Sequence, residues 1–289
     1  MNWSGSSAPE RATDLASPSP STGRAAAAPR RAPRFSDLGL RIAGIVTVLA
    51  ILEIASRAGV LPRAWFPPIS EIYLEFGKLA FGWPLWLEIG RTLGGWALGI
   101  GIATLCAIPL GVLLGASRIA YRLAKAVIEF FRPVPSVALI PLAVLVYGTG
   151  LEMKVFLITF ATFWPILLQT IYGVQDVDPV ARDTARSYGL PPLARFTQIT
   201  LPSAAPYIAT GLRIASAIAL VLAVTAELVV GAPGLGQAIV VAQSNANPTR
   251  MYALIIVAGL LGWALNSGFQ AVERRLLRWH PAQRQEAGK

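Results

Sequence analysis

Long apolar segments alternate with shorter polar ones along most of this 289-residue chain. Six of the apolar segments approach the roughly 20 residues that a helix needs to cross the hydrocarbon layer of a bilayer. The second segment carries glycines four residues apart, a spacing that lets membrane helices pack closely. These glycines are Gly95, Gly99, Gly111 and Gly115. We therefore predict six transmembrane helices, at about residues 39–58, 90–115, 134–150, 153–174, 203–230 and 251–271.

One polar interruption, residues 178–202 between the fourth and fifth segments, carries clear helix boundaries. Asp178 suits an N-cap, because its carboxylate can accept the free amides of a first turn. Pro179 suits the first helical position, where an amide hydrogen is not needed. Gly189 stands about three turns later, where a left-handed C-cap is expected. A pair of prolines then prevents the helix from continuing but can start another. The pattern predicts two short helices joined by a sharp turn.

Both ends of the chain are polar. Residues 1–36 consist largely of Ala, Ser, Pro and Arg, and such a segment cannot bury enough apolar surface to order itself. It also lacks the apolar core of a secretory signal. We expect a disordered tail at 1–36, a six-helix membrane domain at 37–280 and a second tail at 281–289.

Composition and charge support a membrane protein. Hydrophobic residues make up 54% of the chain and charged residues only 14%, against about a quarter in soluble domains. The net charge of +10 could suggest a nucleic-acid partner. The basic residues, however, are scattered at the ends of the apolar segments, which is typical of membrane topology instead. We therefore expect a membrane partner and no nucleic acid.

The distribution of the 25 Lys and Arg residues predicts an orientation. Nineteen lie in the N-terminal part up to Arg41, at 116–132, at 174–213 and in the C-terminal tail, whereas six lie in the alternate loops. Cytoplasmic loops of membrane proteins carry the excess of Lys and Arg. Both termini and the 178–202 stretch are therefore predicted to lie in the cytoplasm.

The chain offers few groups for chemistry of its own. Its single cysteine, Cys106, can form neither an internal disulfide nor a cysteine-based metal site, and we expect a small buried hydrophobe. Its single histidine, His280, lies in the C-terminal tail. These two residues cannot supply a catalytic constellation, and no G-x-x-x-x-G-K-[ST] phosphate loop occurs. We expect no catalytic residues, no metal site and no cofactor.

The 178–202 stretch resembles the EAA motif of bacterial ABC-importer permeases, which reads E-A-A, three residues, G, nine residues, I-x-L-P. The residues at the motif positions are Asp183, Thr184, Ala185, Gly189, Ile199, Leu201 and Pro202. Aspartate replaces the usual glutamate and threonine the first alanine. The first replacement keeps the charge, and the second keeps the small size.

Further segments resemble the nitrate, taurine and aliphatic-sulfonate branch of these permeases. They are Arg132-Pro133-Val134-Pro135, Gly148-x-Gly150-x-x-x-Lys154, Gly211-Leu212-Arg213, Ala226-Glu227 and Gly234-Leu-Gly236. The resemblance covers about residues 60–280. It implies an all-α integral membrane protein with the type I ABC importer permease fold, one cytoplasmic coupling helix and a place in the bacterial inner membrane. The fifth segment departs from the branch, which more often has a tryptophan near Ile218.

The resemblance also implies partners. Such permeases work as dimers, each copy bound to an ATPase subunit and supplied with solute by a separate binding protein. We therefore expect a homodimer that moves a sulfonate, taurine or nitrate-like anion. The longest outer loop, of about 30 residues, is too small for a ligand-binding domain of its own. The motif residues are expected to couple to the ATPase, with Asp183 and Arg186 as polar contacts and with Ala185 and Gly189 kept small for close approach.

One acidic residue of the fifth segment, Glu227, is a further candidate, because a carboxylate inside a membrane segment is a functional hypothesis by default. It lies near the outer end and could belong to an outer gate. The alternative function is a secondary transporter driven by an ion gradient. That alternative requires ionisable groups at the membrane midplane, and the second to fourth predicted segments carry none there.

Overall fold

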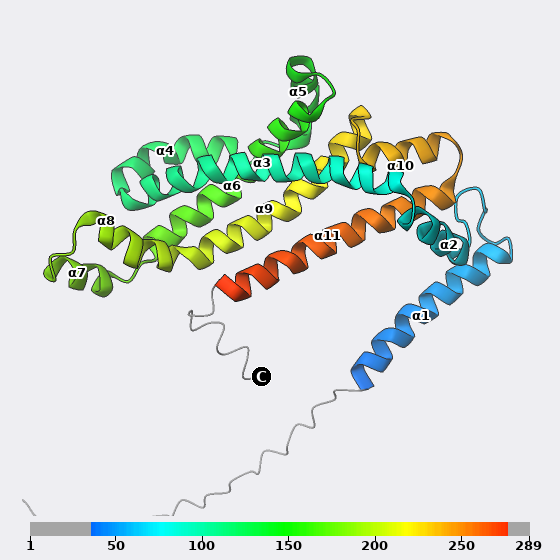
Figure 1. Ribbon diagram of the computed structural model, residues 1–289, viewed down its shortest axis with the longest axis horizontal. Helices are drawn as coiled ribbons and strands as arrows, with labels where there is room; N and C mark the ends of the chain where they lie inside the picture. The colour runs from blue at the N-terminus through cyan, green and yellow to red at the C-terminus, as the bar shows by residue number, and fades with distance from the viewer. Residues whose placement is uncertain (1–35, 277–289) are drawn as a thin grey trace, which may run out of the picture. The chain divides into compact units, whose positions relative to one another are not determined.

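The computed structural model describes residues 36–276, so that most of the two predicted tails lies outside the described residues. Within that range all regular secondary structure is helical, as predicted, with α-helices and short 3₁₀ and π turns joined by loops. Figure 1 shows the long helices α3, α6, α9 and α11 along one another, with the short α7 and α8 at one end and α2 and α10 at the other. These two ends are called the α7 end and the α10 end below.

Four predicted membrane segments are confirmed as long apolar helices. They are α3 (Trp83–Ala116), α6 (Leu151–Gln175), α9 (Leu201–Val230) and α11 (Pro248–Leu276), each long and apolar enough to cross a bilayer. Helices α2 (Ile69–Ala80) and α10 (Leu235–Ser244) are shorter.

The predicted third segment is wrong in its bounds and its shape. Residues 118–131, predicted to belong to a cytoplasmic loop, form the helix α4 (Arg118–Phe131). A short 3₁₀ turn and α5 (Ile140–Tyr147) follow at an angle of 76° to α4. Together the two pieces are long and apolar enough to count as one bent span. The break falls at Pro133 and Pro135, since proline lacks an amide hydrogen and its ring clashes with the preceding turn. If the four basic residues of 116–132 are left out, fifteen Lys and Arg residues remain on the predicted cytoplasmic side and six in the alternate loops. The charge bias therefore keeps its direction.

The predicted first segment is the helix α1 (Ser36–Arg57), which is not among the helices that meet the length and hydropathy criteria in the described range. Its last turns are tied to the start of α2. Glu53 accepts hydrogen bonds from the backbone amide of Ser70 at 3.1 Å and from its hydroxyl at 2.8 Å. Glu53 also pairs with Arg57 at 2.6 Å. This carboxylate thus has a structural role.

The glycines of α3 lie against α6. A Cβ atom on Gly99 would stand 2.5 Å from the Ile158 side chain, and one on Gly111 would stand 2.7 Å from Thr170. Gly115 is equally close to Val174. Such distances exclude any side chain, so the predicted close packing of the second segment is confirmed.

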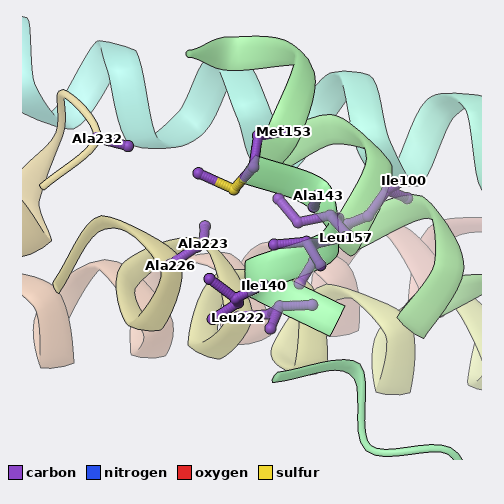
Figure 2. Packing of buried hydrophobic residues seen from close by; sticks show 11 residues of the cluster. Ile100, Ile140, Ala143, Met153, Leu157, Leu222, Ala223, Ala226 and Ala232 are labelled. Atoms are coloured by element: carbon purple, nitrogen blue, oxygen red, sulfur yellow. The ribbon is translucent and has the colours of Figure 1, made fainter. Parts of the chain in front are cut away.

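Buried apolar side chains fill the space between α3, α6 and α9. Figure 2 shows one cluster, in which Met153 and Leu157 of α6 meet Ala223 and Ala226 of α9 and Ile140 of the broken segment. A second cluster lies toward the α7 end, and a third joins α2, α10 and α11. The expectation for Cys106 is wrong, because this residue lies on an exposed face of α3 in the single chain.

Candidate functional site

The α7 end is built from the 178–202 stretch. The side chain of Asp178 accepts a hydrogen bond from the amide of Val180 at 2.8 Å, and Pro179 is the first residue of α7 (Pro179–Ser187). The predicted N-cap is therefore confirmed. The cap satisfies an amide that the helix itself leaves free, and it fixes where α7 begins.

The turn after α7 is equally well defined. Gly189 has a left-handed backbone with φ of +69°, as predicted. The amide of Leu190 donates to the carbonyl of Ala185 at 3.1 Å, a bond that closes the end of the helix. The second predicted short helix is only the four residues of α8 (Pro192–Arg195), because a π turn (Phe196–Thr200) carries the chain directly into α9. The stretch therefore consists of one separate short helix, α7, and a second part that continues into the long helix α9.

The motif residues divide between the two sides of α7. Ala185 is buried, with 4% of its surface exposed, so its small size is used inside this chain. Asp183 and Arg186 lie on the exposed side, 4.0 Å apart, with 73% and 64% of their side chains accessible. Thr184 is exposed as well. Arg182 donates to the carbonyl of Val174 at 3.3 Å, which ties α7 to the last turn of α6.

The remaining motif residues lie in the π turn and at the start of α9. Ile199 and Pro202 line an open cavity of about 700 Å³ beside the α7 end. Leu201 is 39% exposed. Tyr207 and Asp176 also line the cavity, and the hydroxyl of Tyr207 donates to Asp176 at 2.6 Å. The structure thus brings the two halves of the motif to the same end of the molecule.

The α10 end holds a buried ion pair. The Nζ atom of Lys154, on α6, lies 2.9 Å from Oε1 of Glu227, on α9, and their side chains are 3% and 0% exposed. Lys154 also donates to the carbonyls of Pro233 at 2.8 Å and Arg91 at 3.3 Å. Its three donor positions are therefore all used. Such saturation is what a buried charge needs if it is to remain in an apolar interior.

The carboxylate of Glu227 is enclosed just as fully. The hydroxyl of Thr92, on α3, lies 3.0 Å from both of its oxygens, and the amide of Gly236 donates to Oε2 at 2.9 Å. The same hydroxyl accepts from the amide of Leu235 at 3.0 Å. The network therefore joins α3, α6, α9 and the start of α10 through a single carboxylate.

The loop between α9 and α10 contains glycines where this network leaves no room. Gly231 ends α9 with φ of +72°, and Gly234 has φ of +153°. A Cβ on Gly234 would collide with the carboxylate of Glu227, and one on Gly236 would stand 2.5 Å from the carbonyl of Val224. Glu227 thus explains the glycine at 234 and contributes to the one at 236, whereas Gly231 is required by its left-handed backbone.

Two partners in this network are not predicted from the sequence. Lys154 is expected among the charges of an outer loop, whereas the residue is a buried part of α6, and Thr92 is not among the expected site residues. The sequence does place Lys154 at the start of the fourth predicted segment and Glu227 near the end of the fifth, so that the two opposite charges lie on the same side of the membrane. The enclosure of Glu227 favours a positioning role. A gate role remains a prediction.

Among residues 36–276, no cluster of His, Cys, Asp or Glu has the arrangement needed to hold a metal ion. The geometry therefore offers two candidate sites of other kinds. One is an exposed, well-capped helix at the α7 end, and the other is an enclosed ionic network at the α10 end.

Comparison with known proteins identifies the family. Residues 107–278 match the family model described as the binding-protein-dependent transport system inner membrane component. The chain is 31% identical to the aliphatic sulfonates transport permease protein SsuC of Escherichia coli K12, over 88% of this chain and 93% of that protein. It is 29% identical to the taurine transport system permease protein TauC of the same organism, over 86% and 93%.

A solved structure of the MetNI methionine ABC transporter, in an inward-facing conformation, shares the fold. The TM-score is 0.59 at 21% identity, and the match covers 68% of this chain and 97% of the MetNI chain. The predicted all-α permease architecture is thereby confirmed. The chain belongs to the family of inner membrane components of binding-protein-dependent transport systems.

Proposed function

We propose that two copies of this chain form the membrane pathway of an ATP-driven importer. A separate ATPase subunit supplies the energy, and a separate binding protein delivers a small anion of the sulfonate, taurine or nitrate type. The names of the relatives support this class of solute: aliphatic sulfonates, taurine and, for a permease of Leptolyngbya laminosa at 31% identity, nitrate. The binding-protein dependence of the family disfavours the alternative of an ion-gradient-driven transporter.

The observation that carries the proposal is the exposed side of α7. A short helix with a side-chain cap at one end and a left-handed glycine at the other has a fixed length and direction. Its outward side presents Asp183, Thr184 and Arg186, which leaves charged and hydroxyl groups free for a partner. Of the predicted coupling residues, Asp183, Thr184 and Arg186 therefore form an exposed surface on α7, which we assign to the ATPase.

The connections of α7 suit a rigid lever. Arg182 holds one side of it to the last turn of α6, and the turn at Gly189 leads through the π turn into α9. Helices α6 and α9 pack against each other, and the pair Lys154–Glu227 joins them again at the far end. A displacement of α7 by the ATPase would thus move α6 and α9 together. The opening and closing of the pathway would then be a rigid-body motion between two copies.

The orientation follows from the charge bias. The excess of Lys and Arg on the side of the termini and of α7 supports a cytoplasmic α7 end, where ATP is available. The α10 end would then face outward and receive the loaded binding protein.

Site-directed cross-linking tests the assignment of α7. In a chain whose only cysteine has been removed by Cys106→Ala, Arg186→Cys is combined with single cysteines on the ATPase subunit of the same transport system. We expect cross-links from position 186 and ATPase activity that the binding protein stimulates. Lys78→Cys, on α2 at the opposite end and 77% exposed, is the matched control and should give none. Cross-links from position 78 alone would contradict both the orientation and the coupling role.

A further inference from the structure

Helix α4 has three distinct sides, which is unusual for a helix in a membrane bundle. One side packs against α3 and α6 through Tyr121, Ala124 and Ile128. A second side is apolar and exposed, with Leu123 and Phe130 more than two-thirds accessible. The third side is a charged stripe that repeats every three or four residues. The stripe consists of Arg118, Arg122, Lys125, Glu129 and Arg132, all of them exposed.

The stripe runs from the α7 end to the middle of the bundle. Arg118 starts α4 close to the end of α3, which places it at the α7 end. At the other end of α4, the ring of Phe131 stacks on that of Trp164, with centroids 6.1 Å apart and an angle of 1° between the planes. Trp164 lies 13 residues after the start and 11 before the end of α6. Arg132, which lies between the predicted second and third segments, is therefore placed at mid-depth.

Arg132 has no ionic partner among the described residues. The acidic residue nearest in the stripe, Glu129, lies 3.6 Å from Lys125 instead. An arginine that faced lipid at this depth would be strongly unfavourable, and such residues normally face a bundle interior or a water-filled cavity. The break that follows borders an open space. Pro135 and Ser136 line a largely apolar cavity of about 370 Å³, together with Ile218 and Val221 of α9.

We propose that the charged stripe of α4 lines the aqueous half of the pathway between mid-depth and the α7 end, and that Arg132 binds the anionic group of the solute at its inner end. This inference rests on the proposed importer function and names the contact that its solute makes. Guanidinium groups bind planar or tetrahedral oxyanions through paired hydrogen bonds, as sulfonate and nitrate require. Two copies would contribute two such arginines.

The remaining residues of the stripe suit passage better than tight binding. Lys125 is partly neutralised by Glu129, so the net positive charge is moderate along the middle of α4. A pathway lined by one sign of charge raises the local concentration of ions of the opposite sign. Lipid phosphates are a poor alternative ligand for Arg132, because they lie at the membrane surface and this residue lies at mid-depth.

Transport by the reconstituted system tests the inference. The full chain, its ATPase and its binding protein are placed in vesicles of zwitterionic phosphatidylcholine, and uptake of taurine, ethanesulfonate and nitrate is measured together with ATP hydrolysis. The variants are Arg132→Gln and Arg132→Lys, with Lys78→Gln as the control that removes one positive charge from α2. We expect Arg132→Gln to lower anion uptake by at least about tenfold, which corresponds to one charged hydrogen bond. ATPase stimulation by the binding protein should persist, and Arg132→Lys should retain a larger share of uptake.

The outcomes separate this inference from the proposal on which it rests. If the wild-type chain takes up none of the three solutes, the solute class is wrong and the inference is overturned with it. If the wild-type chain is active and Arg132→Gln is equally active, only the inference is overturned. It is also overturned if Arg132→Gln and Glu129→Gln both abolish assembly of two copies, because the arginine then pairs with Glu129 of a second copy. A defect that appears only when anionic phosphatidylglycerol is added would assign Arg132 to a lipid and overturn the inference as well.

Discussion

The two ends of the helical bundle handle charge in opposite ways. At the α10 end, Lys154 and Glu227 are almost completely buried, and the polar groups around them are paired with one another. At the α7 end, Asp183 and Arg186 are exposed and only loosely paired, at 4.0 Å. The buried pair fixes α6 and α9 relative to each other, because the hydrogen-bonding positions of Lys154 and Glu227 are already occupied. The exposed pair leaves its charges available to another protein. One end is thus built for rigidity and the other for contact.

The largest effect is expected from breaking the enclosed end. Lys154→Met removes the cation and leaves the carboxylate of Glu227 buried and unpaired. Removing one partner of a buried ion pair typically costs about 3–5 kcal/mol of stability. We expect the thermal unfolding temperature of the purified protein in detergent micelles to fall accordingly, and transport to be lost with it.

The double variant Lys154→Met/Glu227→Gln removes both charges and keeps similar side-chain volumes. The amide oxygen of the new glutamine can still accept a hydrogen bond from the amide of Gly236, and no net charge is buried. Most of the lost stability should therefore return. Lys78→Met, at an exposed lysine, should leave the unfolding temperature unchanged. Equal unfolding temperatures for Lys154→Met and Lys78→Met would show that the network does not stabilise the fold.

A smaller effect on stability, but a complete effect on transport, is expected from Gly189→Val. The left-handed backbone at this position strains a β-branched side chain by about 1–3 kcal/mol. The end of α7 should therefore shift while the membrane helices stay folded. The measurement is co-purification of the ATPase subunit, together with ATPase activity stimulated by the binding protein.

Gly77→Val is the matched control, because Gly77 lies in α2 with open space around it and an ordinary helical backbone. It should be inserted and active. Normal ATPase binding and stimulation in Gly189→Val would refute the coupling role of α7.

The smallest effect is expected from the N-cap. Asp178→Ala removes the acceptor for the amide of Val180 and should cost about 1 kcal/mol of local stability. Hydrogen exchange in the first turn of α7 should become several-fold faster, while exchange in α3 and α6 stays unchanged. Asp178→Asn keeps an acceptor and should behave like the wild-type chain. Faster exchange throughout the bundle would mean that the α7 end is not separable from the core.

The difference between the two ends also explains what could be predicted from the sequence. The α7 end depends on local rules: a capping aspartate, a proline at the first position and a glycine where the helix must turn. Each of these acts within a few residues, so the 178–202 stretch could be understood by itself. The glycine packing of α3 was also foreseeable, because small residues at a spacing of four indicate a close neighbour.

The α10 end depends on contacts between distant parts of the chain. Thr92 and Glu227 are 135 residues apart, and no local pattern connects them. The prolines after Arg132 were visible, but the angle of 76° depends on how α4 packs against α3 and α6. A sequence shows that a helix is interrupted more readily than it shows where the two pieces lie. For that reason the bounds of the third segment and the position of Arg132 could not be predicted.

The glycines of α3 bear on how the gene can vary. Gly99, Gly111 and Gly115 lie against side chains of α6 and leave no space for even one methyl group, whereas Gly90, Gly94 and Gly101 of the same helix have open space at the corresponding point. Natural selection therefore acts unequally on residues of one type within one helix. In a population of related genes, alanine codons should accumulate at the three open positions and be purged at the three closed ones. The sequence history of α3 would then record which of its sides lies against α6.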